Sequence, residues 1–329
     1  MQDEQVGNLT LLIPHPSLSG RAFYLCLGHT CLTAPRGLRD LREQARAMAG
    51  RREEEARRRL VMKYPGAASG AAGGIEMRMV FVVGMAGSGK SLLTGSFAEW
   101  LREQEQNVVT VNLDPGAAEL PYEPDVDVRA YVTVEEVMEK YGLGPNGAMI
   151  AAADMIATYV KELESEVSGL GPDIAIVDTP GQMEVFAFRP SGLFIVHGLT
   201  NWPKALIYLF DACFSKEPAN FVANIFLASA VYYRFFTPQV YALTKCDLVD
   251  PGDVKRMVEW SSKPKALLDA LETALRGDRR LITRDFVRAI ARTGLSFPLI
   301  PVSSTTCQGF LNLNMALERV ISAGERYTF

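Results

Sequence analysis

The stretch MVFVVGMAGSGKS, from Met79 to Ser91, decides the fold of this sequence. Its first residues, Met79–Val83, form a short apolar and β-branched run of the kind that becomes a fully buried parallel strand. The residues that follow, Gly84–Ser91, match the pattern GxxxxGKS at every fixed position. An amphipathic helix is expected over Leu92–Arg102, so the motif has the preceding strand and the following helix that a phosphate-binding P-loop requires.

The P-loop pattern assigns a role to each of its positions. Glycines allow the main chain to curl so that successive N–H groups face the phosphates, at the positive end of the helix that begins near Lys90. Lys90 is expected to reach the β- and γ-phosphates, and Ser91 is expected to ligate Mg²⁺. The other residues predicted to line the phosphates are Gly84, Gly87, Ser88 and Gly89.

A second apolar run, Val108–Leu113, ends in NLDPGAAELPY and places Asp114 at the carboxyl end of a strand. Ligands of open α/β sheets bind at that end of the strands. We interpret Asp114 as a residue that holds a Mg²⁺-bound water or orients the attacking water. The alternative is an ordinary turn residue before Pro115.

A third acidic position follows the predicted buried strand Asp173–Val177, in the sequence DTPGQME. A DxxG pattern after an apolar strand is how P-loop GTPases sense the γ-phosphate. Asp178 is expected in the outer coordination sphere of Mg²⁺, and the Gly181 N–H is expected to contact the γ-phosphate and to release it on hydrolysis. Gln182 follows directly and is a candidate to touch the nucleophilic water.

The base-binding end of the site is predicted from TKCDL, which follows the core strand Val240–Leu243 and begins at Thr244. A carboxylate accepts two parallel hydrogen bonds from the N1–H and N2–H groups of guanine, whereas adenine offers no such pair. Asp247 is therefore expected to select guanine, with the aliphatic stem of Lys245 lying across the base.

A further strand, Leu299–Val302, ends in two serines. Ser303 or Ser304 is expected to place a backbone N–H near guanine O6. Cys246 lies between the two base-reading residues, but no histidine or other base can be assigned to it. We interpret Cys246 as a small filler and not as a nucleophile.

Composition excludes several classes of protein. With 329 residues and 48% hydrophobic content the chain can bury a large core, and a net charge of −4 argues against a protein that mainly coats nucleic acid or anionic lipid. No run of 18 apolar residues indicates a membrane span, and the first residues, MQDEQ, lack the order of a signal peptide. Five cysteines without a CxxC pair favour a reduced, cytoplasmic chain without a structural metal.

The composition changes near residue 76. Residues 1–76 contain eleven basic and eight acidic residues, ten of the basic ones being Arg, whereas residues 77–329 carry a net charge of −7. This N-terminal extension is predicted to hold an Arg-rich helix over Leu38–Met62 and a flexible linker over Gly66–Gly74. Three interpretations stay open: a basic arm for RNA or a partner, a disordered tail, and a native start at Met77 or Met79.

The insertion YGLGPNGAM, Tyr141–Met149, indicates the family. Together with the P-loop, LDPGAAELPY, DTPGQME and TKCDL in that order, it resembles the GPN-loop GTPases over about residues 77–329. The resemblance implies a Mg²⁺-dependent GTPase related to the dimeric signal-recognition and MinD-like class, working as a homodimer or a dimer of paralogues. Met85 stands where MinD-like relatives carry a signature lysine, so catalysis by such a lysine is not expected.

The resemblance also implies roles for the tripeptide Gly144, Pro145 and Asn146. This loop would enter the active site of the partner, where Asn146 contacts the γ-phosphate or the departing phosphate. Independently of the family, Gly and Pro predict a sharp exposed turn, and an Asn amide can donate to a phosphate oxygen. A plain turn is the alternative. In eukaryotic relatives the family implies a role in assembling or transporting RNA polymerase.

The sequence therefore predicts a doubly wound α/β domain over residues 77–329, with a mostly parallel sheet, right-handed crossovers and a helical insertion at about 250–294. The insertion is expected to contain helices over Lys263–Arg276 and Ile282–Arg292. GTP hydrolysis is the predicted activity, either for turnover or as the switch of a nucleotide-gated assembly factor. The remaining alternative is a P-loop kinase that uses ATP or GTP.

Overall fold

The computed structural model describes five stretches of the chain: residues 26–27, 30–31, 77–275, 278–292 and 297–324. The chain divides into two compact units, Met1–Ser69 and Gly70–Phe329. In the first unit β1 (Cys26–Leu27) pairs antiparallel with β2 (Thr30–Cys31). The predicted helix and linker of the N-terminal extension lie outside the described residues.

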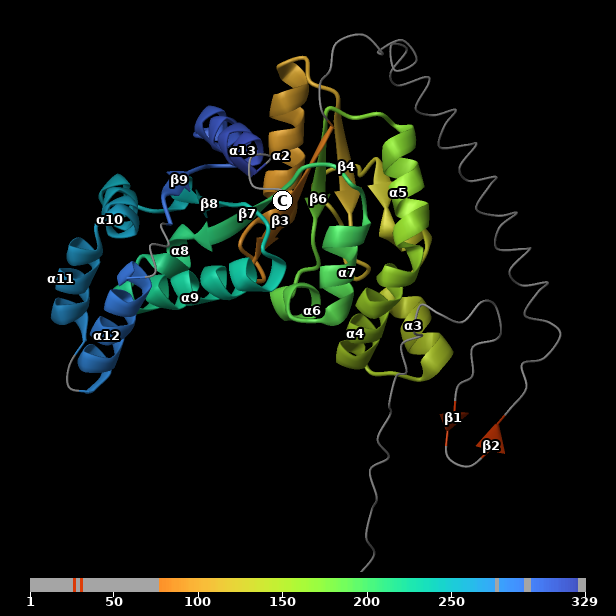
Figure 1. Ribbon diagram of the computed structural model, residues 1–329, viewed down its shortest axis with the longest axis horizontal. Helices are drawn as coiled ribbons and strands as arrows, with labels where there is room; N and C mark the ends of the chain where they lie inside the picture. Colours follow the sequence, from red (N-terminus) through yellow and green to blue (C-terminus); the bar gives the residue numbers. More distant parts are fainter. Residues whose placement is uncertain (1–25, 28–29, 32–76, 276–277, 293–296, 325–329) are drawn as a thin grey trace, which may run out of the picture. The chain divides into compact units, whose positions relative to one another are not determined.

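The second unit is built on a seven-stranded sheet with the order β5-β4-β6-β3-β7-β8-β9 (Figure 1). Its strands are β3 (Arg78–Gly84), β4 (Val108–Asn112), β5 (Val126–Asp127), β6 (Ile174–Asp178), β7 (Lys204–Asp211), β8 (Gln239–Thr244) and β9 (Leu299–Pro301). Every neighbouring pair is parallel. The predicted doubly wound α/β sheet is confirmed, and it is parallel throughout rather than mostly so.

Strand register brings the predicted site residues to one edge of this sheet. Val82 of β3 pairs with Asp178 at the end of β6, which also pairs with Asn112 at the end of β4. On the other side of β3, Gly84 pairs with Leu209 of β7. Because parallel strands end at the same edge, the loops that follow these strands meet above a single surface.

Helices cover both faces of the sheet, as Figure 1 shows. One face carries α2 (Lys90–Glu103) and α13 (Phe310–Gly324). The opposite face carries α3 (Val134–Tyr141), α4 (Pro145–Ile156), α5 (Val160–Gly169), α6 (Met183–Ala187), α7 (Pro190–Gly198) and α9 (Pro218–Phe235). Alternate residues of β3 serve the two sides: Val80 and Val82 pack with Phe97 of α2, whereas Phe81 packs with Phe186 of α6. All five side chains are buried, so β3 is the centre of both cores.

The path of the chain explains the double winding. From β3 the chain passes through α2 on one face and moves towards the β5 edge, and from β6 it passes through α7 and α9 on the opposite face towards the β9 edge. Crossovers of one hand must use opposite faces when they run in opposite directions. The P-loop, between β3 and α2, therefore lies where the connections change from one face of the sheet to the other.

Among the described residues between β8 and β9, three α-helices follow a 3-10 turn: α10 (Pro251–Ser262), α11 (Pro264–Ala274) and α12 (Asp278–Arg292). The predicted helices at 263–276 and 282–292 correspond to α11 and α12, with boundaries that differ by a few residues. The insertion is not a separate body, because Trp260 packs edge-on against Phe221 of α9, with ring centroids 5.4 Å apart.

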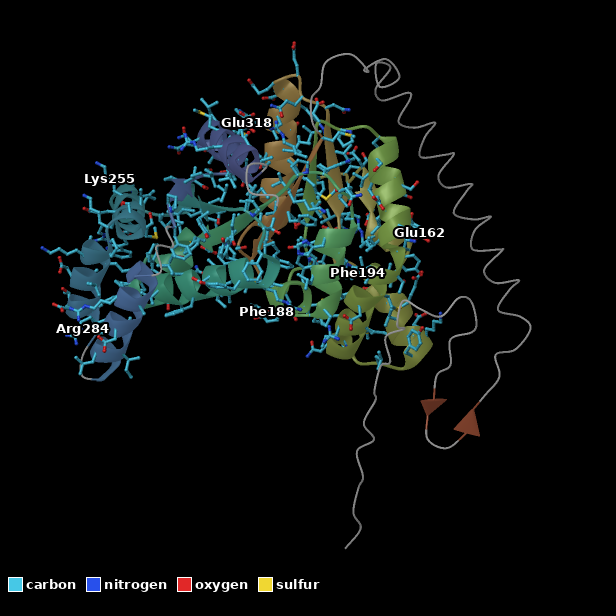
Figure 2. All side chains as sticks on the ribbon, viewed as in Figure 1. Glu162, Phe188, Phe194, Lys255, Arg284 and Glu318 are labelled. Atoms are coloured by element: carbon cyan, nitrogen blue, oxygen red, sulfur yellow. The ribbon has the colours of Figure 1, made fainter. Side chains whose placement is uncertain are left out.

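The aromatic residues between Leu193 and Phe236 differ widely in exposure. Phe210 and Phe235 are buried, but Phe194 on α7 is 59% exposed and Phe236 is 73% exposed. Figure 2 shows Phe194 and Phe188 on the outside of the helical layer. None of the helices in the described part of the chain combines the length and the apolar character that a membrane crossing requires.

Candidate nucleotide-binding site

The P-loop has the backbone conformation that its glycines allow. Gly87 and Gly89 have φ angles of +74° and +93°, which side chains with a Cβ rarely adopt, and Gly89 directly precedes the first residue of α2. At Gly84 a Cβ would lie 2.7 Å from Ser88 Oγ and 2.9 Å from Leu209 Cβ. The loop is therefore packed against β7, and its glycines are required for this path.

Lys90 lies inside the loop and is only 5% exposed. Its Nζ donates to the carbonyl oxygens of Gly84 and Met85, both at 3.1 Å, and to that of Gly181 at 2.9 Å. The ammonium therefore connects the P-loop to the DTPG segment, although 91 residues separate Lys90 from Gly181. The predicted phosphate lysine is at the point where both phosphate-sensing elements meet.

Three carboxylates surround this ammonium. Burial lowers the pKa of Lys90, and the negative charges of Asp178, Asp114 and Glu184 act in the opposite direction. A site with more acidic than basic groups favours a divalent cation together with a polyphosphate over a free anion. Glu184, in the first turn of α6, is a charged group near the site that the sequence did not single out.

Asp178 is completely buried at the end of β6. Tyr122 Oη donates to its Oδ2 at 3.2 Å, and no hydrogen-bond partner reaches its Oδ1 among the described residues. Burial raises the pKa of Asp178 to about 6, against the opposing effects of the Ser91 hydroxyl and the Lys90 charge. A buried carboxylate oxygen without a donor, beside a serine hydroxyl, fits a Mg²⁺ ion with its coordinated water.

No group of three or more His, Cys, Asp or Glu side chains that could hold a metal ion occurs among the described residues. Mg²⁺ usually keeps several waters and takes one or two protein ligands together with phosphate oxygens. Ser91 and Asp178, the two residues predicted for the metal, therefore suffice when a nucleotide supplies the remaining oxygens.

Asp114 lies two residues beyond β4 and makes two hydrogen bonds through its carboxylate. Oδ1 accepts from the Gly116 N–H at 3.0 Å, and Oδ2 accepts from the Gly181 N–H at 2.7 Å. The first contact is the turn interaction that formed the alternative interpretation of this residue. The second occupies the N–H group that was expected to contact the γ-phosphate, so Asp114 and a phosphate would compete for it.

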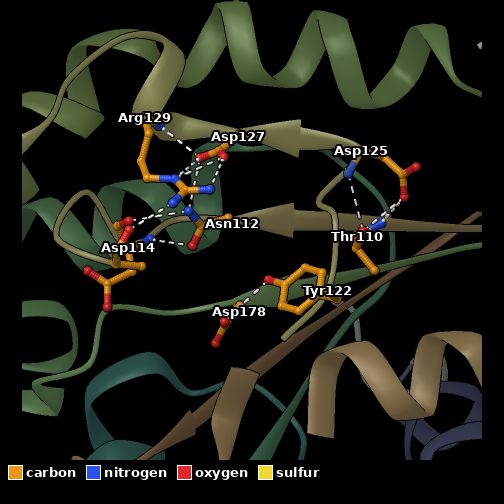
Figure 3. Close-up of polar contacts among 9 residues, drawn as sticks. Thr110, Asn112, Asp114, Tyr122, Asp125, Asp127, Arg129 and Asp178 are labelled. Atoms are coloured by element: carbon orange, nitrogen blue, oxygen red, sulfur yellow. Dashed lines mark hydrogen bonds and ion pairs between the residues drawn. The ribbon is translucent and has the colours of Figure 1, made fainter. Parts of the chain in front are cut away.

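A network of polar contacts behind Asp114 fixes its loop (Figure 3). The buried Asn112 side chain accepts from the Asp114 N–H at 2.9 Å and donates to Asp127 Oδ1 at 2.9 Å. Arg129 donates to both carboxylate oxygens of Asp127 and to the Ala117 carbonyl. The loop that carries Asp114 is thereby tied to β5 at the edge of the sheet.

The base end is joined directly to the P-loop. Thr244, at the end of β8, donates through Oγ1 to the Ser88 carbonyl at 2.8 Å. Lys245 has a left-handed backbone, with φ of 60°, and its Nζ donates to the Gly87 carbonyl at 2.6 Å and to Asp211 Oδ2 at 2.7 Å. The ammonium of Lys245 is thus held above the P-loop.

Asp247 lies exposed in the next turn. The Ser303 hydroxyl and Thr305 lower the pKa of Asp247, and Thr305 Oγ1 lies 3.2 Å from Oδ2. The Ser303 N–H donates to the Gln308 carbonyl at 3.1 Å. Ser303 therefore contributes its hydroxyl to the carboxylate, and its N–H is not free for guanine O6 as was expected; of the two serines considered, Ser304 is the one left for that contact.

Cys246 does not have the properties of a nucleophile. Its Sγ donates to the Leu243 carbonyl at 3.1 Å, and burial raises the pKa of the thiol to about 11. A thiol with a raised pKa is inert at neutral pH, in agreement with its interpretation as a filler.

Comparisons with known proteins are consistent with this geometry. A family profile described as "Conserved hypothetical ATP binding protein" matches residues 82–323. A GPN-loop GTPase of Pyrococcus abyssi is 40% identical over 181 residues, which cover 54% of this chain and 71% of that protein. The chain belongs to the GPN-loop GTPase family. A crystal structure described as a GTPase in apo form from Pyrococcus abyssi matches with a TM-score of 0.66 and 33% identity, covering 75% of this chain and 98% of that one.

Other relatives are longer than the matched region. GPN-loop GTPase 1 of Dictyostelium discoideum is 35% identical over 195 residues, which are 58% of this chain and 48% of that protein. The chain thus spans about half the length of this relative. The family assignment rests on the common nucleotide-binding core.

In this member of the GPN-loop family the tripeptide that names the family begins a helix. Gly142, with φ of 63°, ends α3, and Gly144 precedes α4, of which Pro145 and Asn146 are the first residues. The expected sharp turn is therefore a junction between two helices, with Pro at the position where a helix accepts it best. Gly144, Pro145 and Asn146 are all exposed. Gln182 is also exposed, immediately before α6.

Besides Glu184, the sequence analysis did not identify Tyr122 and Asp211 as residues of the site. Tyr122 contacts Asp178 across 56 positions, and Asp211 contacts Lys245 across 34. Asp211 had a signal, because it follows the apolar run of β7 at the same edge as Asp178. Tyr122 had none beyond its place in LPYEP, since a tyrosine in a polar loop is not distinctive.

Proposed function

We propose that this GPN-loop protein is a Mg²⁺-dependent GTPase that hydrolyses the β–γ phosphoanhydride bond of GTP. The observation that carries the proposal is the contact of Lys245 and Thr244 with the P-loop carbonyls of Gly87 and Ser88. It joins a base-reading segment and a phosphate-binding loop into one continuous surface. The exposed carboxylate of Asp247 lies two residues beyond Lys245 on that surface.

Guanine selection follows from the charge of Asp247. The lowered pKa of Asp247 keeps the carboxylate ionised and therefore a pure hydrogen-bond acceptor at neutral pH. Guanine offers two N–H donors side by side, whereas the corresponding edge of adenine presents the N1 acceptor. The matching family profile is described as ATP-binding, and the geometry of Asp247 argues for GTP.

The phosphate end provides groups for charge stabilisation and for water. Backbone N–H groups of the P-loop and the ammonium of Lys90 stabilise the charge that develops during in-line attack of water on the γ-phosphate. Ser91 and Asp178 would hold Mg²⁺, which would supply charge neutralisation at the phosphates. Asp114 is close enough to Gly181 to orient the attacking water, and Gln182 remains a candidate for the same task.

The finer proposals concern partners. We propose a homodimer in which the exposed Asn146 contacts the γ-phosphate of the partner subunit's nucleotide, so that hydrolysis depends on dimer geometry. A GTP-dependent change in the dimer would suit a nucleotide-gated assembly factor in the cytoplasm, with a protein client such as RNA polymerase by family resemblance. The N-terminal extension keeps the open interpretations given above.

Phosphate release by the full chain tests the activity. With Mg²⁺, GTP should be hydrolysed and ATP should not, and Lys90→Ala should abolish turnover. Turnover with ATP alone would favour the kinase-like alternative, and phosphate release by Lys90→Ala at the wild-type rate would place the reaction elsewhere.

Protein concentration tests the dimer. Specific activity should rise with concentration in the wild type, and Asn146→Ala should lower turnover about 100-fold, as for other single groups that stabilise transition-state charge. Asn201→Ala, at an exposed position before β7, is the matched control and should be neutral. Concentration-independent turnover that Asn146→Ala leaves unchanged would remove this loop from the mechanism.

A further inference from the structure

Tyr122 makes a contact for which the proposed reaction has no role yet. It comes from the loop between β4 and β5, and its hydroxyl donates to Asp178 Oδ2 at 3.2 Å (Figure 3). The other oxygen of Asp178, Oδ1, is buried and meets no hydrogen-bond donor among the residues that the structure describes. One oxygen of the carboxylate is thus fixed by the phenol, and the other is left for the metal side of the site.

We propose that Tyr122 is a positioning residue for the Mg²⁺ site: its hydroxyl holds Asp178 Oδ2 so that Oδ1 faces the metal-bound water beside Ser91. The inference rests on the proposed GTPase function and adds a residue to it. Tyr122 touches neither phosphate nor metal in this proposal, and it acts only through Asp178.

The ring of Tyr122 packs closely on α2 because Gly95 has no side chain at the point of contact. A Cβ at Gly95 would lie 2.8 Å from Tyr122 Cβ and 3.2 Å from both Cγ and Cδ1. Gly95 is one helical turn beyond Ser91, so the ring packs on the same helix that carries the predicted Mg²⁺ ligand. The phenol therefore relates the positions of Ser91 and Asp178 to each other.

The segment after Tyr122 is held independently. Asp125 Oδ2 accepts from the Thr110 N–H at 2.8 Å and from Arg102 Nη2 at 2.7 Å. Arg102 belongs to α2 and Thr110 to β4, so the loop is fastened to both elements three residues after the tyrosine. These anchors fix the position of the Tyr122 hydroxyl relative to Asp178.

The chemistry of the pair suits a permanent donor. Burial and the charge of Asp178 raise the pKa of Tyr122 far above neutrality, so its hydroxyl keeps its proton. Without this donor a buried carboxylate oxygen would lose its partner and the carboxylate could turn about its χ2 angle. The metal would then meet a carboxylate that is no longer oriented.

The test uses the full chain and fluorescent methylanthraniloyl-GDP, with release measured in Mg²⁺ and in EDTA. Tyr122→Phe keeps the ring and removes the hydroxyl. It should raise about ten-fold the Mg²⁺ concentration at which half of the nucleotide stays bound, as expected for the loss of one hydrogen bond to a charged group. The rate of nucleotide release in EDTA should not change. Tyr233→Phe, at an exposed tyrosine on α9, is the control and should match the wild type.

A second variant reaches the same contact by another route. Gly95→Ala displaces the ring and should likewise weaken Mg²⁺ binding while leaving nucleotide release in EDTA unchanged. The double variant should bind Mg²⁺ no more weakly than the weaker of the two single variants. If both variants released the nucleotide faster by the same factor in Mg²⁺ and in EDTA, or did not change its release in either, the positioning role would be overturned. The proposed function would stand in that case as long as the wild-type chain binds GDP. Failure of the wild-type chain to bind GDP would overturn both.

Discussion

Asp114→Asn should raise the affinity for GTP relative to GDP while slowing hydrolysis. In the structure Asp114 Oδ2 accepts the Gly181 N–H at 2.7 Å, and Oδ1 is already occupied by the Gly116 N–H. If the Gly181 N–H is to contact a γ-phosphate, it must first leave the carboxylate. Asn retains one acceptor oxygen and replaces the other with an NH₂ group, so it cannot hold both N–H groups at once.

The magnitude follows from this contact. A hydrogen bond to a charged group contributes about 1.5–3 kcal/mol net, and because Asp114 is only half-buried the lower figure applies, which is roughly a ten-fold change in binding. GDP has no γ-phosphate to compete for the N–H, so its affinity should change little. The predicted effect is therefore a selective, roughly ten-fold gain for the triphosphate.

Calorimetric titration with GDP and with a non-hydrolysable GTP analogue, both in Mg²⁺, measures this directly. The matched control is Asp173→Asn. The Asp173 carboxylate accepts the Asn107 N–H at 2.9 Å and lies just before β6, at the amino end of that strand and away from the nucleotide site. The control variant should leave the ratio of the two affinities unchanged. Weaker binding of the GTP analogue by Asp114→Asn would refute the competition and show that the carboxylate supports the γ-phosphate site.

Three further predictions concern the metal-free chain and its glycines. Because the folded pKa of Asp178 is raised to about 6 from 3.8, the fold takes up the proton more readily than the unfolded chain, so stability increases as pH falls through 6. Urea unfolding in EDTA should show the wild type gaining about 1.3 kcal/mol between pH 7 and pH 5 relative to Asp178→Asn, and parallel curves would contradict it. Gly309→Ala should lower the free energy of unfolding by roughly 2–4 kcal/mol, because its φ is +84° and a Cβ would meet the Pro301 carbonyl. The control Gly252→Ala, in open space on α10, should be within about 1 kcal/mol of the wild type. Equal unfolding midpoints for the two variants would refute this packing. Lys90→Ala should weaken GDP binding about 100-fold in the EDTA fluorescence assay, in which an unchanged affinity would remove the ammonium from the phosphate site.

The core of the fold could be predicted from the sequence because its strands are short apolar runs that end in polar motifs. Met79–Val83 and Val240–Leu243 were each found to within a residue or two at either end. The order of the strands in the sheet was not readable from these runs, and the doubly wound arrangement came from the P-loop pattern. Helix ends were less certain, as at α11, because caps and connecting segments there carry weak signals.

The GPN segment shows why local patterns can have two meanings. Gly, Pro, Asn and Gly are all turn formers, so Gly144–Gly147 predicted a turn. Pro is equally favourable in the first turn of a helix, and the apolar residues that follow, including Ala148 and Ala152, are buried on one face of α4. Packing against α3, α6 and α7, which a local pattern does not contain, decided for the helix.

The site residues that the sequence analysis missed depend on contacts between distant parts of the chain. Tyr122 and Asp211 belong to the site because they contact Asp178 and Lys245, which lie far away in the chain. Ser303 or Ser304 was predicted to offer an N–H to the base, and in the structure the Ser303 N–H donates to the Gln308 carbonyl within the same loop. Motifs reveal which residue types are present, and only the fold reveals which of their atoms are already bonded.

Nucleotide competition for the base pocket tests whether Asp247 selects guanine, with methylanthraniloyl-GDP bound to the full chain and displaced by unlabelled GTP, ATP or xanthosine triphosphate. We expect GTP to displace the probe from the wild type and ATP to require at least about 100-fold higher concentrations, because adenine lacks the two N–H donors that pair with Asp247. Asp247→Asn should weaken GTP and favour xanthosine triphosphate, because xanthine carries a carbonyl where guanine has its amino group. Displacement by ATP as effective as by GTP, or an Asp247→Asn variant with the wild-type preference, would contradict the account.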